Sequence, residues 1–131
     1  MGSVSHETAA SFAKQNLLGV FGERDSAKRL SRMKETYDPS IIFHEPNDTV
    51  QGYDAVDIVI SKLLEGKDDW TFKPVGKLWV NHDMVTLEWA FGPDGHPAVV
   101  HGNDIMLVNK DGRIREMYTM IKGVSDAEIS G

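Results

Sequence analysis

The chain has 131 residues and no cysteine, and its 20 acidic and 14 basic residues give a formal net charge of −6. This length suits a single domain, residues 1–131, with flexible ends expected at residues 1–5 and 123–131. The lack of cysteine excludes disulfides, thiolate metal sites and cysteine nucleophiles, and the acidic balance argues against nucleic acid or anionic membranes as partners. With no run of signal-peptide or membrane-spanning length, we expect a cytoplasmic protein.

The first half of the chain predicts helices with one short strand among them. Apolar residues at helical spacing, with capping residues before them, predict helices over Glu7–Phe21, from Asp25 to Tyr37 and over Tyr53–Glu65. Ser40–Glu45 has the composition of a strand, and residues 47–52 that of a polar loop.

The second half predicts an antiparallel sheet. Residues 70–121 are rich in β-branched and aromatic side chains, and turn residues at 81–83, 92–95 and 109–112 divide them into about four long strands. Helices followed by a meander indicate an α+β fold in which the helices pack against one face of a curved sheet.

One ionisable residue, Asp104, lies inside an apolar strand of the predicted 98–121 hairpin. Because side chains alternate along a strand, Asp104 shares a face with Val100 and Met106, while His101 lies on the other face. If that face is an apolar interior, the pKa of the carboxyl rises and the group becomes a neutral hydrogen-bond donor or a poised acid. The alternative is an aspartate paired with a polar group of a neighbouring strand.

Several short segments resemble one superfamily. They are Tyr37-Asp38-Pro39, His44-Glu45-Pro46, Gly52, Gly102-x-Asp104 and Asp111-Gly112-Arg113-Ile114. Their order resembles the nuclear transport factor 2-like superfamily over about residues 8 to 122, and within it the SnoaL-like polyketide cyclases and ketosteroid isomerases. The resemblance implies a cystatin-like cone, in which two helices, a strand and a third helix precede a four-strand antiparallel meander. It also implies a homodimer formed through the outer face of the sheet.

The resemblance also implies an active site. Glu45 matches the general base of the isomerases, and Asp104 matches the protonated acid that donates a hydrogen bond to the developing enolate. His101 is a candidate partner of the pocket aspartate, as in SnoaL-like cyclases, although strand alternation opposes this pairing unless a bulge intervenes. The expected ligand-binding residues are Tyr37, Tyr53, Val85, Leu87, Trp89, Val100, Gly102, Met106, Met117 and Thr119.

The sequence therefore predicts an acid/base isomerase or cyclase that acts on a small, mostly apolar carbonyl compound through an enolate. No cofactor is indicated, and no metal, because histidines and carboxylates do not recur at ligand-like spacing. The pocket is expected to take a small hydrophobic or aromatic ligand.

Two other classes of function remain open. The isomerases carry a tyrosine on the first helix and this chain has none before Tyr37, which favours a non-catalytic ligand-binding or adaptor dimer. A dehydratase would use histidines, of which His44, His82, His96 and His101 are available. An epoxide hydrolase would need an arginine between two aspartates, and neither Arg113 nor Arg115 has the expected spacing to Asp104.

Overall fold

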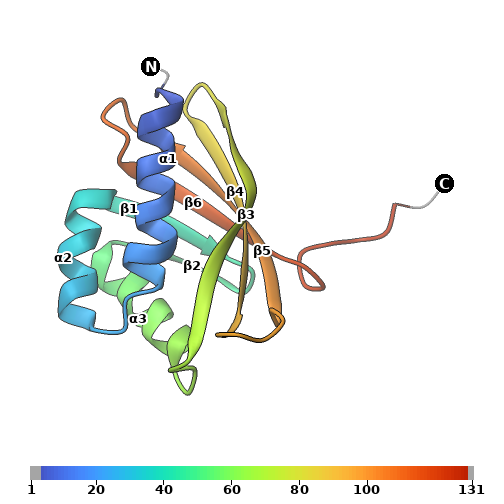
Figure 1. The fold of residues 1–131 in the computed structure, drawn as a ribbon. Coiled ribbons are helices and arrows are strands. Elements are labelled where there is room, and N and C mark those ends of the chain that lie inside the picture. The colour runs from blue at the N-terminus through green and yellow to red at the C-terminus, as the bar shows by residue number, and fades with distance from the viewer. Residues whose placement is uncertain (1–3, 130–131) are drawn as a thin grey trace.

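A six-stranded, strongly curved sheet wraps around the helices (Figure 1), in a computed structural model that describes residues 4–129. The helices are α1 (His6–Lys14), the π-helix η1 (Gln15–Phe21), α2 (Ser26–Thr36) and α3 (Tyr53–Leu64). The strands are β1 (Tyr37–Glu45), β2 (Asp48–Gln51), β3 (Trp70–Asn81), β4 (Met84–Pro93), β5 (Val100–Val108) and β6 (Ile114–Ile121), arranged in the order β2-β1-β6-β5-β4-β3. This confirms the predicted α+β fold, with helices first and a four-strand meander second.

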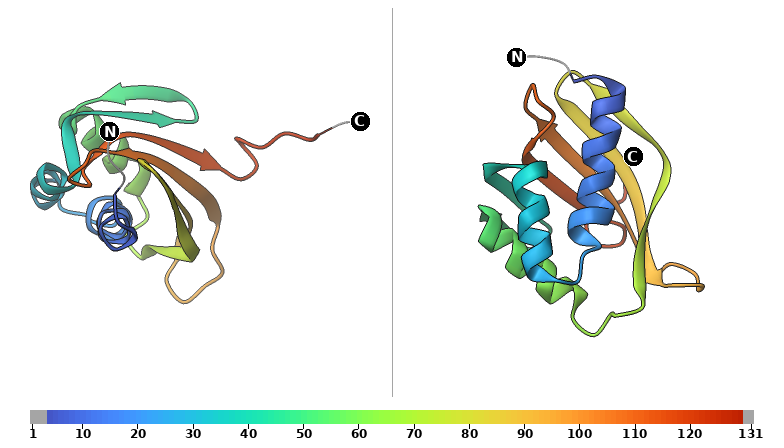
Figure 2. Two further views of the ribbon diagram at one scale, coloured as in Figure 1. Left: turned by 90° about the horizontal axis from the view of Figure 1, so that it is seen from above. Right: turned by 60° about the vertical axis from the view of Figure 1, so that its left-hand side comes forward.

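The helices all lie on the concave side of the sheet, as both views in Figure 2 show. Buried apolar side chains from β1, β4, β5 and β6 meet those of the helices there, and they form one continuous core. None of the helices within residues 4–129 has the length and apolar character that crossing a membrane requires.

The predicted caps are present at the first two helices. The Ser5 hydroxyl accepts a hydrogen bond from the Thr8 amide at 3.1 Å, and the Asp25 carboxylate accepts one from the Ala27 amide at 3.2 Å. Val4 is buried, while the segment after β6 turns and leads away from the body in Figure 1. Residues 1–3 and 130–131 of the predicted flexible ends lie outside the described residues.

Three local features differ from the sequence predictions. Residues 48–51, predicted as part of a polar loop, form β2, which pairs with the end of β1. The first helix is α-helical only to Lys14 and continues as η1. Strand β1 begins at Tyr37 rather than at Ser40. Pro39 is tolerated within it because the pairing with β6 is interrupted between Tyr37 and Ile42.

The hairpin between β5 and β6 contains the predicted turn and one bulge. The Gly112 amide bonds to the Asn109 carbonyl at 2.9 Å, and Gly112 has a φ of 93°, which favours glycine. Val108 pairs with Ile114 but Leu107 pairs with Glu116, so Arg115 is the extra residue. Its guanidinium donates to the Val108 carbonyl at 2.5 Å. The bulge shifts the pairing by one residue and places Thr119, rather than Tyr118, opposite Asp104.

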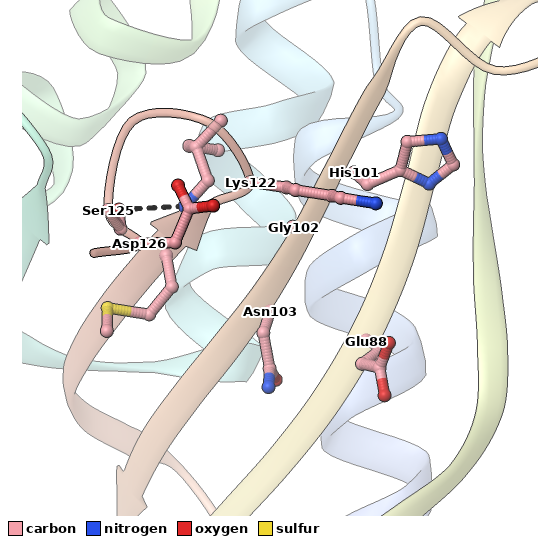
Figure 3. Close-up of a pocket in the computed structure, with 9 residues that line it drawn as sticks. Glu88, His101, Gly102, Asn103, Lys122, Ser125 and Asp126 are labelled. Carbon is pink, nitrogen blue, oxygen red and sulfur yellow. Dashed lines mark hydrogen bonds between the residues drawn. The ribbon is translucent and has the colours of Figure 1, made fainter. Parts of the chain in front are cut away.

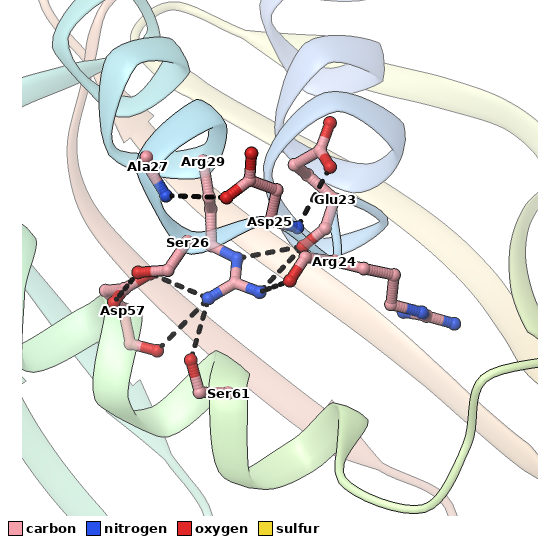
Figure 4. A network of polar contacts seen from close by, with 8 residues as sticks. All are labelled: Glu23, Arg24, Asp25, Ser26, Ala27, Arg29, Asp57 and Ser61. Atoms are coloured by element: carbon pink, nitrogen blue, oxygen red, sulfur yellow. Dashed lines mark hydrogen bonds and ion pairs between the residues drawn. The ribbon is translucent and has the colours of Figure 1, made fainter.

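A buried arginine ties the helices together, as shown in Figure 4. Arg29 of α2 is 1% exposed, and its guanidinium donates to the Asp57 carboxylate at 2.7 Å and to the Ser61 hydroxyl at 2.9 Å, both on α3. It also donates to the carbonyl of Glu23, in the loop before α2, at 2.7 Å. The network fixes α3 against α2 and thereby fixes one wall of the cavity described below.

We expect Arg29→Met to lower the free energy of unfolding by about 3 kcal/mol, because it leaves the Asp57 carboxylate without its buried partner. The matched control is Arg32→Met, since Arg32 forms a more exposed pair with Glu23 and should cost less than about 1 kcal/mol. Urea denaturation of both variants checks this. Equal losses in the two would contradict a structural role for Arg29.

Candidate active site

A cavity of about 550 Å³ lies between the concave face of the sheet and the helices η1 and α3. Its walls are mainly apolar and aromatic, and its polar groups are few. The lining residues are Leu17 and Phe21 of η1, Val59, Lys62 and Leu63 of α3, Phe43, Glu45, Trp89, Phe91, Val100, Asp104, Thr119 and Ile121 of the sheet, and Pro46, Asn47, Asp48 and Val124. Such a cavity suits a small apolar ligand that carries one or two polar groups.

Asp104 is the buried carboxylate of this cavity, with 5% of its surface exposed. Its Oδ1 accepts a hydrogen bond from the Trp89 indole at 2.9 Å and one from the Thr119 hydroxyl at 2.8 Å. Burial raises the pKa of Asp104 to about 6, and the bonds from Trp89 and Thr119 oppose that rise. A pKa of about 6 makes Asp104 a poised acid rather than a permanently neutral donor at neutral pH.

Glu45 lines the same cavity from the end of β1. It is half-buried and precedes Pro46, at the point where the chain turns from β1 to β2. Asn47 of that turn, Asp48 at the start of β2 and Lys62 of α3 also line the cavity. The structure therefore brings the two predicted acids, Glu45 and Asp104, to one cavity. Among residues 4–129 no group of three or more His, Cys, Asp or Glu side chains could hold a metal ion.

Tyr37 and Asn16 form a buried polar pair in the core. The Tyr37 hydroxyl donates to the Asn16 side-chain oxygen, and the Asn16 amide donates to the Met117 sulfur at 3.4 Å. Burial, and to a lesser degree the charge of Asp104, raises the pKa of Tyr37 well above its ordinary value. Tyr37 is thus a permanently protonated donor whose hydroxyl is engaged by Asn16, and it does not line the cavity as predicted.

His101 lies on the opposite face of the sheet, and the prediction that it works beside Asp104 is wrong. It is exposed and lines a shallow hollow of about 280 Å³ with Glu88, Asn103 and Lys122 (Figure 3). Strands β4 and β5 pair without a shift from Phe91 and Val100 to Met84 and Leu107. Because no bulge intervenes, strand alternation holds and His101 points away from Asp104.

Of the ten predicted ligand-binding residues, Trp89, Val100 and Thr119 line the cavity. The others do not line it, for different reasons. Val85, Met106 and Met117 are buried in the core, Leu87 lines a separate groove beside α1, Gly102 lies under the Trp89 indole, and the Tyr53 hydroxyl bonds to the Tyr37 carbonyl at 3.1 Å.

The sequence analysis missed the contribution of the helices to the cavity. Leu17, Phe21, Val59 and Leu63 belong to the apolar stripes that predicted helices, and those stripes alone do not distinguish a cavity wall from a filled core. Lys62, a cation on the cavity wall, carries no local sequence signal at all.

The family can be assigned from the sequence itself. The family model of the SnoaL-like domain matches residues 21–117. The chain belongs to the SnoaL-like family. This confirms the resemblance to the nuclear transport factor 2-like superfamily. We found no curated protein that matches the chain.

Solved structures show the same fold at low sequence identity. A candidate isomerase of the SnoaL-like family from Agrobacterium tumefaciens superposes with a TM-score of 0.81 at 16% identity, over 89% of this chain and 99% of that chain. A candidate SnoaL-like polyketide cyclase from Jannaschia gives 0.72 at 15% identity, over 93% and 94%. A steroid delta-isomerase from Pseudomonas aeruginosa gives 0.61 at 20% identity, over 90% and 82%.

The buried carboxyl predicts a pH-dependent stability. The pKa of Asp104 is about 6 in the folded protein against an ordinary 3.8, so the folded protein binds more protons than the unfolded chain between these values. The stabilisation is complete below about pH 4 and is lost as the pH rises through about 6; it amounts to about 3 kcal/mol. Urea denaturation should show the wild type losing this much relative to Asp104→Asn between pH 4 and pH 7. If the difference in unfolding free energy between the two proteins did not change with pH, the Asp104 carboxyl would be solvated rather than buried.

Proposed function

We propose that this SnoaL-like protein is a cofactor-independent acid/base isomerase or cyclase that acts on a small, mostly apolar carbonyl compound through an enolate. The observation that carries the proposal is the pair of acids, Glu45 and Asp104, in one largely apolar cavity. The similar folds of a steroid delta-isomerase and of a candidate polyketide cyclase support the reaction class.

In the proposed mechanism the two acids have different roles. Glu45, half-buried, takes the proton next to the substrate carbonyl and returns it to another carbon. An apolar substrate packed against the Asp104 carboxyl buries it further and raises its pKa above about 6. The protonated carboxyl then donates a hydrogen bond to the developing enolate oxygen.

The cavity limits the substrate class. Its volume of about 550 Å³ and the aromatic rings of Phe21, Phe43 and Phe91 fit a compact hydrophobic or aromatic molecule. Glu45, Asp48 and Lys62 supply the remaining polar contacts, so the substrate carries its polar substituent at that end.

The rival enzyme classes have less support. Among the described residues no histidine or arginine lines the cavity, whereas a dehydratase would use the first and an epoxide hydrolase the second. Arg113 instead pairs with Asp111, and Arg115 with Asp83. The remaining rival is a non-catalytic ligand-binding or adaptor dimer, which would not depend on either acid.

The test replaces each acid by a side chain of similar size that cannot exchange protons. We expect Glu45→Gln and Asp104→Leu each to slow hydrogen–deuterium exchange next to the carbonyl of cyclic ketones by about 10²- to 10⁴-fold, followed by NMR. Glu88→Gln is the matched control, because Glu88 is exposed on the outer face of the sheet. Wild-type exchange in both acid variants would favour the adaptor.

We also propose a homodimer formed through the outer face of the sheet, because this face exposes large apolar side chains. They include Trp79, Met84, Tyr118 and Met120. Buried in a two-fold interface, they would supply the contact that a stable dimer needs.

Analytical ultracentrifugation should therefore show a dimer that Tyr118→Glu dissociates, since a charge would then lie in an apolar interface. Ile58→Glu, at an exposed apolar position on α3 rather than on the sheet, is the control and should leave the dimer intact. A monomeric wild type would contradict this proposal.

A further inference from the structure

The two oxygens of the Asp104 carboxyl have unequal surroundings. Oδ1 accepts both hydrogen bonds, from Trp89 at 2.9 Å and from Thr119 at 2.8 Å. Oδ2 accepts none from any of residues 4–129, and the residue lines the cavity. A carboxyl that exchanges a proton or donates a hydrogen bond can use only an oxygen that substrate can reach, so this inequality bears on the proposed chemistry.

Trp89 can reach Asp104 only because residue 102 is a glycine. Gly102 lies directly opposite Trp89 in the pairing of β4 with β5. A Cβ at Gly102 would lie 2.2 Å from Cζ2 of the indole, which is far inside contact distance. The missing side chain lets the ring lie across β5, and an edge-on contact with Phe72 at 5.5 Å between ring centroids packs it from the other side.

Thr119 reaches the same oxygen through the β5–β6 register. The bulge at Arg115 shifts the pairing so that Thr119 lies opposite Asp104. Without the bulge Tyr118 would occupy this place and would direct its phenol toward the site. Two independent features of the sheet, a glycine and a bulge, thus deliver two donors to one oxygen.

We propose that Trp89, seated on Gly102, and Thr119 are positioning residues that occupy Oδ1 of Asp104 and reserve Oδ2 for the substrate oxygen. The inference deepens the proposed function and rests on it for the nature of the group that Oδ2 meets. Because Oδ1 is filled by donors, a proton on the carboxyl resides on Oδ2 and points into the cavity. The hydrogen bond to the enolate oxygen therefore comes from a group whose direction is set before substrate binds.

The same two bonds counteract the effect of burial on Asp104, because donors to Oδ1 favour its ionised form. The other charged groups of this cavity are Glu45, Asp48 and Lys62, and the nearby Tyr37 stays protonated. None of these is altered in the variants below.

The first experiment is an NMR titration of the Asp104 carboxyl carbon, which needs no substrate. Thr119→Val and Trp89→Phe should each raise the pKa of Asp104 from about 6 toward about 7 or above, and Thr119→Ser should restore it. Gly102→Ala should act like Trp89→Phe, since it displaces the indole. Thr86→Val, on the outer face, and Trp70→Phe, which packs on Phe91 without bonding to Asp104, are the matched controls.

The second experiment separates position from pKa. At a pH where Asp104 has the same protonation state in wild type and variant, Thr119→Val and Trp89→Phe should lower kcat for ketone exchange by about tenfold or more. Thr119→Val changes little of the cavity wall, so its KM should stay within about twofold of the wild-type value.

Unchanged titrations in both Thr119→Val and Trp89→Phe would overturn the proposal, and so would raised pKa values with an unchanged kcat. If the titrations move as expected while the wild type exchanges no ketone, the two hydrogen bonds act on Oδ1 as described and the proposed function is what fails. Should Gly102→Ala not fold, Trp89→Phe and Thr119→Val still decide the question.

Discussion

The candidate site depends on keeping one carboxyl group, that of Asp104, inside a mainly apolar cavity. Water is largely excluded there, so the ionised form is disfavoured and the pKa rises to about 6. Two hydrogen bonds to one oxygen limit that rise and fix the orientation of the group. The cavity walls and these two donors therefore act in opposite directions, and their balance leaves a carboxyl that can gain or lose a proton near neutral pH.

This balance depends on the register of the strands in the curved sheet rather than on a single sequence motif. Continuous pairing of β4 with β5 places Trp89 over Gly102, and the bulge at Arg115 places Thr119 opposite Asp104. The helices complete the enclosure, with η1 and α3 lining the side of the cavity that faces the sheet. The Arg29 network holds α3 against α2, so a buried ion pair outside the cavity helps to keep its wall in place.

Much of this could be predicted from sequence, because it follows from periodicity. Helical spacing and turn residues gave the order of elements and the 109–112 turn, and strand alternation placed Asp104 and His101 on opposite faces. The expectation that Thr119 lines the pocket came from the family resemblance. The strand β2, the π-helix η1 and the bulge at Arg115 were not predictable, since each depends on tertiary pairing that local composition does not specify. For the same reason Gly102 was expected among the ligand-binding residues, whereas the space left by its missing side chain is occupied by the Trp89 indole. His101 was expected beside Asp104 only if a bulge reversed its direction, and the pairing of β4 with β5 has none.

On the proposed mechanism, the position of Asp104 couples occupancy of the cavity to its protonation. The carboxyl lines the cavity, and burial raises its pKa to about 6. An apolar molecule packed against the carboxyl would bury it further and favour the neutral form, which is the form that donates a hydrogen bond. A polar ligand that brought its own water would leave Asp104 ionised and unable to donate. On the proposed mechanism the site would therefore select ligands by how completely they exclude water, in addition to their shape.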